Sequence, residues 1–174
     1  PFIVVHSSLV EALDREELRC VVGHEVGHIL SGHALYHTML FVLLRMMDSV
    51  LPFSAVALPI LLALQEWSRK SELSADRAGL LVVQDIEIAQ RVDLKLAGGG
   101  AMAGLDVEAF AAQAEEYEEN GSLGDNIAKL VNLAFASHPF PVLRISELRK
   151  WGASKEYEAI LEGDYPERDS DDEA

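Results

Sequence analysis

Two histidines one helical turn apart dominate the chemistry that this sequence could perform. The segment His-Glu-Val-Gly-His occupies positions 24–28, inside a stretch, residues 15–31, that we predict to be a helix. On a helix His24 and His28 share a face, so both imidazole rings can reach one small cation. Glu25 stands beside them, where its carboxylate could take a proton from a water at that cation. A chain of this length contains this H-E-x-x-H arrangement by chance roughly once in a few hundred cases, so a third ligand is needed.

A second predicted helix, at residues 71–79, supplies a candidate for that ligand. Glu72 and Asp76 are four positions apart on it and therefore share a face. Glu72 can complete a site of two histidines and one glutamate that leaves a fourth position open, as a catalytic zinc requires. Asp76 can accept the outward ring N–H of a ligand histidine and fix its tautomer. Three small residues would let this helix approach the first one closely: Ala75, Ala78 and Gly79. The alternative is an ordinary surface helix with acidic residues, which the neighbouring histidine motif makes less favoured.

These segments, with a third motif, resemble those of a known family. The histidine motif at 24–28, the Glu72-x-x-x-Asp76 run, and the sequence Ser-His-Pro at 137–139 followed by Arg144 are similar to the gluzincin peptidases of the HtpX and CAAX-prenyl-protease family. The likeness extends from about residue 1 to about residue 149. It is specific because three motifs occur in the same order.

The resemblance implies a zinc endopeptidase with a helical catalytic domain. One Zn²⁺ per chain would be bound by His24, His28 and Glu72, with Glu25 as the general base. The resemblance also implies that His138 lies near the scissile carbonyl, where it would stabilise the oxyanion of the transition state. Arg144, on the helix that follows, would pair with Asp76 or another acid and orient the site.

Composition and charge are compatible with this interpretation. The chain has 174 residues, of which 49% are apolar and 7% are aromatic. This composition suits a helical protein. Together with the resemblance, it leads us to expect a mainly α (α+β) fold, a zincin-like helical domain with a small β-strand element near the N-terminus. A formal net charge of −15 argues against nucleic acid as a partner, because there is no basic patch to meet phosphates. The resemblance implies a polypeptide substrate. Cys20 is the single cysteine, which fits a reducing compartment, and we expect a cytoplasmic location.

We expect residues 1–162 to form the catalytic domain and residues 163–174 an acidic, disordered tail. Residues 38–67, between the two motifs, predict an apolar helical hairpin insert. It is either packed in the core or dips into a bilayer, as in HtpX-like relatives. Two charged residues and two prolines, with fewer than about 20 uncharged residues in a row, favour the core: Arg45, Asp48, Pro52 and Pro59. Association with the cytoplasmic face of a membrane, through this segment or through one preceding Pro1, is the other interpretation.

Several other residues carry simpler expectations. Residues 2–5 are a β-branched apolar run and predict a strand, either at a substrate-binding edge or buried. Two pairs of residues three positions apart indicate capping-box helix starts: Ser8 with Glu11, and Asp14 with Glu17. Cys20 cannot join a site with His28, because eight residues of helix span about 12 Å, so we expect it in the core. His33 and His37 are expected on the side of the helix opposite the two motif histidines, and Gly32 could interrupt the helix before them. We therefore do not expect either to be a metal ligand.

We therefore expect a zinc-dependent endopeptidase, compatible with a role in protein quality control, that cleaves peptide bonds with a metal-activated water. The alternative is a latent or non-proteolytic metal-binding domain, with its cleft covered by residues 38–67 or by a missing segment. A purely structural zinc site would be closed by a fourth protein ligand, usually Cys or His, and Cys20 is out of reach. The enzyme is therefore the favoured interpretation.

Overall fold

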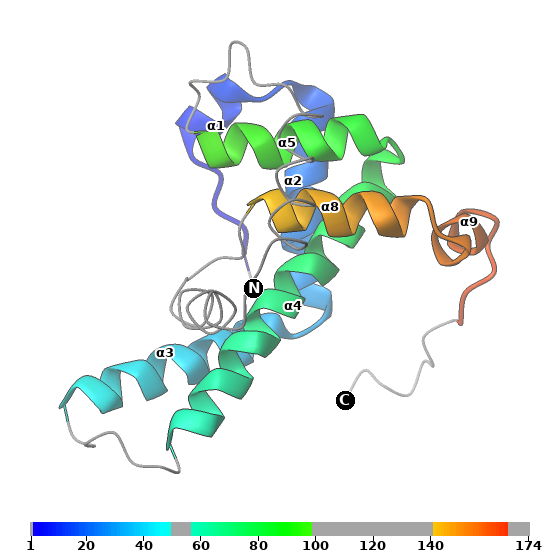
Figure 1. Cartoon of the computed structure of the whole chain (residues 1–174). Helices are drawn as coiled ribbons and strands as arrows, with labels where there is room; N and C mark the ends of the chain where they lie inside the picture. Colours follow the sequence, from blue (N-terminus) through cyan, green and yellow to red (C-terminus); the bar gives the residue numbers. More distant parts are fainter. Residues whose placement is uncertain (1, 50–56, 99–140, 167–174) are drawn as a thin grey trace, which may run out of the picture.

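The computed structural model describes residues 2–49, 57–98 and 141–166, and within them the chain is helical (Figure 1). The prediction of a mainly α fold is confirmed. The helices are α1 (Ser7–Ala12), α2 (Arg15–Leu30), α3 (His33–Ser49), α4 (Ala57–Val83), α5 (Ile86–Gly98), α8 (Pro141–Gly152) and α9 (Lys155–Leu161). His138, the turn of the predicted hairpin at residues 50–56 and the tail from residue 167 lie outside the described residues.

The small β element predicted near the N-terminus is not supported. Residues 2–6 form neither helix nor strand. A strand is stabilised by hydrogen bonds to a neighbouring strand, and the described part of the chain contains no strand that could pair with this run. Its side chains remain largely in solvent, with Phe2 87% and Val4 65% exposed.

The start of α2 follows from local sequence. The Asp14 carboxylate accepts a hydrogen bond from the Glu17 backbone N–H at 2.9 Å, and the Glu17 carboxylate accepts one from the Asp14 N–H at 2.9 Å. This is the predicted capping box, which satisfies two helix donors reciprocally. The corresponding prediction for Ser8 is wrong, because α1 begins one residue earlier, at Ser7, with His6 as a cap that makes no side-chain hydrogen bond.

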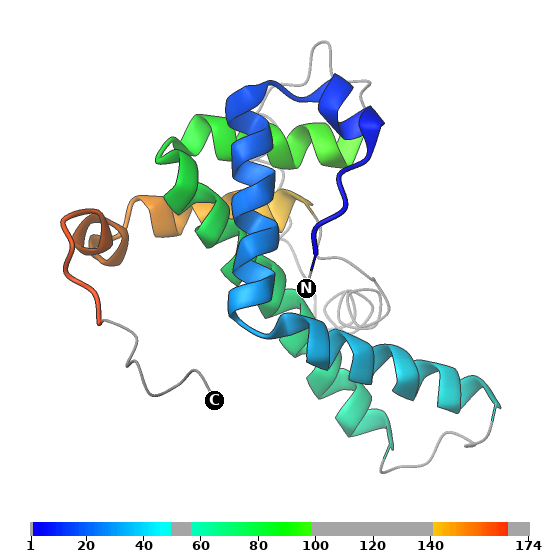
Figure 2. The same ribbon diagram turned by 180° about the vertical axis from the view of Figure 1, so that it is seen from behind.

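Small residues bring α2 and α4 into close contact where the two helices cross (Figure 2). A Cβ atom at Gly27 would lie 2.7 Å from Cβ of Ala78, and one at Gly79 would lie 3.0 Å from the carbonyl oxygen of Cys20. Larger side chains would hold the helices apart, so the predicted close approach of the two motif helices is present. This crossing places the histidine and glutamate motifs beside each other.

The hydrophobic core lies between α2, α4, α5 and α8, with α9 packed at one end. Its buried members come from all four helices: Cys20, Leu80, Ala89, Val92, Leu148 and Trp151. The prediction that Cys20 packs in the core is confirmed, with 6% of the residue exposed. A buried ion pair also joins α2 to α5, because the Glu17 carboxylate lies 2.6 Å from the Lys95 ammonium while 1% of its side chain is exposed.

Within the predicted hairpin insert, the described residues 38–49 and 57–67 are helical. α3 and the first half of α4 run side by side and project from the other helices (Figures 1 and 2). Many of the apolar side chains on this pair are exposed: Leu35, Tyr36, Met39, Phe41, Val42, Ile60 and Leu62. These side chains are therefore not packed in the core, contrary to the interpretation that the sequence favoured for this segment. None of the helices in the described ranges combines the length and the apolar character that crossing a bilayer requires.

Candidate metal centre

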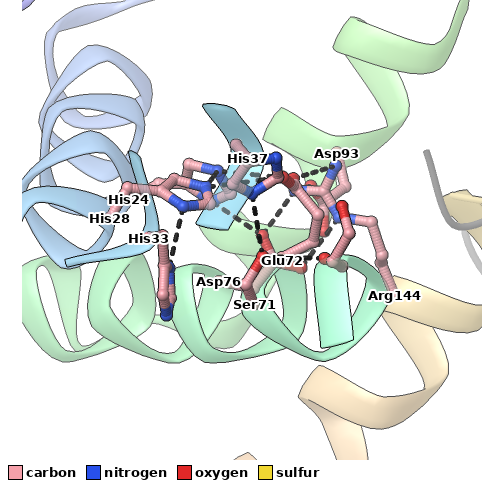
Figure 3. Close-up of polar contacts among 10 residues, drawn as sticks. His24, His28, His33, His37, Ser71, Glu72, Asp76, Asp93 and Arg144 are labelled. Carbon is pink, nitrogen blue, oxygen red and sulfur yellow. Dashed lines mark hydrogen bonds and ion pairs between the residues drawn. The ribbon is translucent and has the colours of Figure 1, made fainter. Parts of the chain in front are cut away.

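Three side chains from α2 and α4 converge on one point. The Nε2 atoms of His24 and His28 are 3.0 Å apart, and the Glu72 carboxylate oxygens lie 3.7 Å from the first and 3.5 Å from the second (Figure 3). Two donors bound tetrahedrally at about 2.0–2.1 Å from a zinc ion would be separated by about 3.3 Å. The three donor atoms therefore have the spacing and chemistry of a site with two histidines and one carboxylate, and they are the group in the described chain that could hold a metal ion.

The outer nitrogen of His24 is held by a carboxylate. Nδ1 of His24 lies 2.9 Å from Oδ1 of Asp76, which is 5% exposed. Burial, the largest single effect on His24, opposes its charging, but the hydrogen bond to Asp76 and the negative charges of Asp76 and Glu72 together raise the pKa of His24. The pKa of Asp76 is lowered, against its burial, by the hydrogen bonds from His24 and Arg144. This contact leaves Nε2 of His24 as the nitrogen that faces His28 and Glu72.

Arg144 of α8 anchors the carboxylates behind the histidines. Its Nε donates to Oδ2 of Asp76 at 2.8 Å, and its Nη2 donates to Oδ1 of the same residue. The predicted contact between Arg144 and Asp76 is thus present. The same guanidinium lies 3.8 Å from Glu72 and 3.1 Å from Asp93. One partly buried cation therefore links three carboxylates that come from two helices.

Asp93 of α5 belongs to this cluster and was missed by the sequence argument. It is 6% exposed, and burial, followed by the negative charge of Asp76, raises its pKa to about 7. One signal was available in the sequence, because Asp93 follows Ala89 by four residues on the apolar stripe of its helix. A charged residue on a buried face generally has a partner.

The position of His33 corrects the prediction that it lies opposite the motif histidines. Gly32 adopts a left-handed backbone, with φ of +66°, and separates α2 from α3. The helical phase is therefore not carried across this turn. Nδ1 of His33 lies 2.9 Å from Nδ1 of His28. Burial, followed by the charge of His24, lowers the pKa of His28 to about 4. Burial also lowers the pKa of His33.

His37 also turns toward the site, again contrary to the prediction. Its ring centroid lies 5.9 Å from that of His28, and its Nε2 lies 3.1 Å from Oγ of Ser71 (Figure 3). Its ring nitrogens are not part of the group of three donors described above.

A cleft of about 600 Å³ opens beside the donors. Glu25 lines it and is exposed to solvent, next to His24 and His28. The lining also includes four apolar residues, Phe2, Ile3, Ile29 and Ala34. The geometry therefore places an exposed carboxylate and the candidate metal donors on one open cleft.

Comparison with known proteins agrees with a peptidase of this kind. Residues 1–152 match the model of peptidase family M48. The chain belongs to this family of metallopeptidases, which confirms the resemblance to HtpX-type peptidases.

Among characterised proteins the chain is similar to the plastoglobule-localized metallopeptidase 48, chloroplastic, of Arabidopsis thaliana. The two are 40% identical over 166 residues, which cover 92% of this chain and 48% of the relative. The chain thus spans about half the length of that relative. No solved structure matches the chain.

Proposed function

We propose that this chain is the catalytic domain of a zinc-dependent endopeptidase in which His24, His28 and Glu72 bind the metal. The observation that carries the proposal is the convergence of these three donors from two helices. The outer nitrogen of each histidine already faces another side chain, so both Nε2 atoms are directed to the same point. Membership of a metallopeptidase family supports the same conclusion.

Glu25 is proposed as the general base. Its carboxylate lines the cleft beside both candidate ligand histidines and is free to meet a water that attacks the substrate carbonyl. A zinc ion bound there would polarise that carbonyl and lower the pKa of the water. Glu25 then takes the proton from the water and passes it to the leaving amine. His138 is proposed to hydrogen-bond the oxyanion. Asp76 and Arg144 keep His24 oriented.

The alternative, a latent metal-binding domain, predicts a different structure around the cleft. It requires the cleft to be covered, for example by the hairpin. In the described residues α3 and the first half of α4 project away from the core, and Glu25 remains exposed. The described part of the hairpin thus favours an accessible cleft.

The test compares Glu25→Gln with Glu72→Gln. The purified protein and both variants are assayed for zinc content after dialysis and for cleavage of an unfolded protein such as casein. Glu25→Gln should keep about one zinc per chain and lose cleavage by about 10²–10⁴-fold, since the amide cannot accept the proton. Glu72→Gln should lose zinc itself, because a neutral amide is a poor zinc ligand.

Glu87→Gln is the matched control. Glu87 is exposed on α5 and does not line the cleft, so its variant should behave as the parent. Cleavage at the parent rate by Glu25→Gln would show that Glu25 is not the base. Equal loss of zinc from both test variants would instead make Glu25 a ligand or a folding determinant.

A further inference from the structure

The two candidate ligand histidines have different partners behind them. Nδ1 of His24 contacts the Asp76 carboxylate, whereas Nδ1 of His28 lies 2.9 Å from Nδ1 of a third histidine, His33 (Figure 3). His33 is the first residue of α3 and is only 7% exposed. The partner of His28 is therefore a buried imidazole at the start of α3, not a carboxylate.

The short distance between these two nitrogens requires one proton between them. A neutral imidazole carries its proton on one nitrogen and accepts on the other. If His28 presents an unprotonated Nε2 to the metal, its proton is on Nδ1 and is donated to His33. His33 must then accept with Nδ1 and carry its own proton on Nε2. If His33 donated instead, the proton of a neutral His28 would sit on Nε2 and block ligation.

Aromatic packing holds His33 in place for this contact. Its ring centroid lies 5.4 Å from that of Trp67, nearly edge-on at 83°. Trp67 also packs against Tyr36 at 4.7 Å and His37 at 5.5 Å. Since Trp67 is on α4, the helix that carries Glu72 also supports the partner of His28.

From this arrangement we infer that His33 is a positioning residue of the metal centre, which selects the tautomer of His28 and fixes the rotation of its ring without binding the metal. This inference rests on the proposed function, because it assumes that His28 ligates a metal ion. With His33, the proposed metal centre includes a residue of α3 in addition to the ligands on α2 and α4. Partners of ligand histidines typically contribute 10–100-fold to metal affinity.

Two substitutions separate the hydrogen bond from the bulk of the ring. His33→Leu removes the acceptor and leaves the Nδ1–H of His28 without a partner. In His33→Asn the amide oxygen is separated from Cα by the same number of covalent bonds as Nδ1 of histidine, so an acceptor is retained near the same place. His6→Leu, on an exposed residue before α1, controls for weak surface binding of zinc.

The measurement is the zinc dissociation constant, obtained by competition with a chromophoric chelator. Circular dichroism of each metal-free variant checks that it is folded. We expect about 10–100-fold weaker binding for His33→Leu, a value near the parent's for His33→Asn, and no change for His6→Leu. Substitution of Co²⁺ for zinc then reports the ligand set, which should be the same in the parent and in His33→Asn.

Three results would overturn the inference. Parent-like zinc affinity in His33→Leu would show that the hydrogen bond does not matter. Equal weakening in both His33 variants would show that only the ring volume matters. Complete loss of zinc from His33→Leu, as expected for His28→Ala, together with a Co²⁺ spectrum of His33→Asn that differs from the parent's, would make His33 a ligand. A parent protein that binds no zinc would refute the proposed function itself and the inference with it, so the two failures are distinguishable.

Discussion

Replacement of Gly27 by alanine should disturb the metal centre through the helix crossing. Gly27 lies between His24 and His28 in sequence and faces α4. A Cβ atom at this position would lie 2.7 Å from Cβ of Ala78 and 3.4 Å from Cα of Ala75. Non-bonded carbon atoms prefer separations of about 3.5–4.0 Å. The two helices would therefore have to move apart by about 1 Å at this contact.

The expected magnitudes follow from opposing effects. Alanine is favoured over glycine within a helix by about 1 kcal/mol, whereas overpacking a tight contact costs about 1–3 kcal/mol. We expect a net loss of about 0–2 kcal/mol in the free energy of unfolding. The effect on zinc should be clearer, because Glu72 is on α4 and the histidines are on α2. A shift of about 1 Å exceeds the tolerance of about 0.2 Å for metal–ligand distances, so the affinity for zinc should fall at least about tenfold.

A double-mutant cycle with Ala78→Gly tests this reasoning. In the double variant the added methyl group at position 27 no longer meets a Cβ at position 78, and the next neighbour is Cα of Ala75 at 3.4 Å. The assays are urea unfolding followed by circular dichroism, and zinc affinity by chelator competition. We expect a favourable coupling of about 1–3 kcal/mol between the two changes, with zinc affinity restored toward the parent value.

Gly152→Ala serves as the control in α8. Its added Cβ would lie 3.4 Å from side-chain atoms of Ile86 and Leu80, so zinc affinity should be unchanged. If Gly27→Ala binds zinc as the parent does, or if the two changes are additive within about 0.5 kcal/mol, the contact does not set the separation of the helices and the reasoning is refuted.

Two further predictions concern buried groups outside the three donors. In the metal-free protein, burial and the charge of Asp76 raise the pKa of Asp93 from 3.8 to about 7, so the folded state binds its proton more tightly than the unfolded state. The contribution of Asp93 to the free energy of unfolding therefore falls as the pH rises through this window. The difference in unfolding free energy between Asp93→Asn and the parent should accordingly shift in favour of the variant from pH 4 to pH 8. Urea unfolding in chelator at both pH values measures this gain, and a pH-independent difference would contradict it. Burial raises the pKa of the Cys20 thiol to about 12. The thiol should therefore react slowly with a disulfide reagent at pH 8 in the folded protein and rapidly in urea. Fast reaction in the folded protein would contradict the core position of Cys20.

Local sequence was sufficient for the elements that carry the chemistry. The four-residue spacing of His24 and His28 predicts a shared helix face, and the Asp14–Glu17 pair predicts where that helix starts. Both predictions depend on backbone hydrogen bonds and side-chain contacts within one or two turns. The small residues on α4 also indicated a close helix crossing. Each of these features involves residues that are close together in the sequence, so they can be recognised without knowing the fold.

Contacts between segments far apart in sequence were decided by the tertiary structure. Arg144 contacts Asp76, 68 residues away, and the same guanidinium reaches Asp93 on a third helix. Whether such groups meet depends on how the helices pack around the common core, which no periodicity encodes. The N-terminal apolar run likewise has β-branched side chains, but a strand needs a partner, and among the described residues the fold provides none.

His33 shows most directly where local reasoning ended. A continuous helix would have placed it away from His28, but the left-handed turn at Gly32 starts a new helix with its own phase. The sequence by itself determined which residues could bind a metal and which helices present them. The packing of α3, α5 and α8 around α2 and α4 decided which side chains lie behind the donors, because a single turn or crossing angle redirects every side chain that follows it.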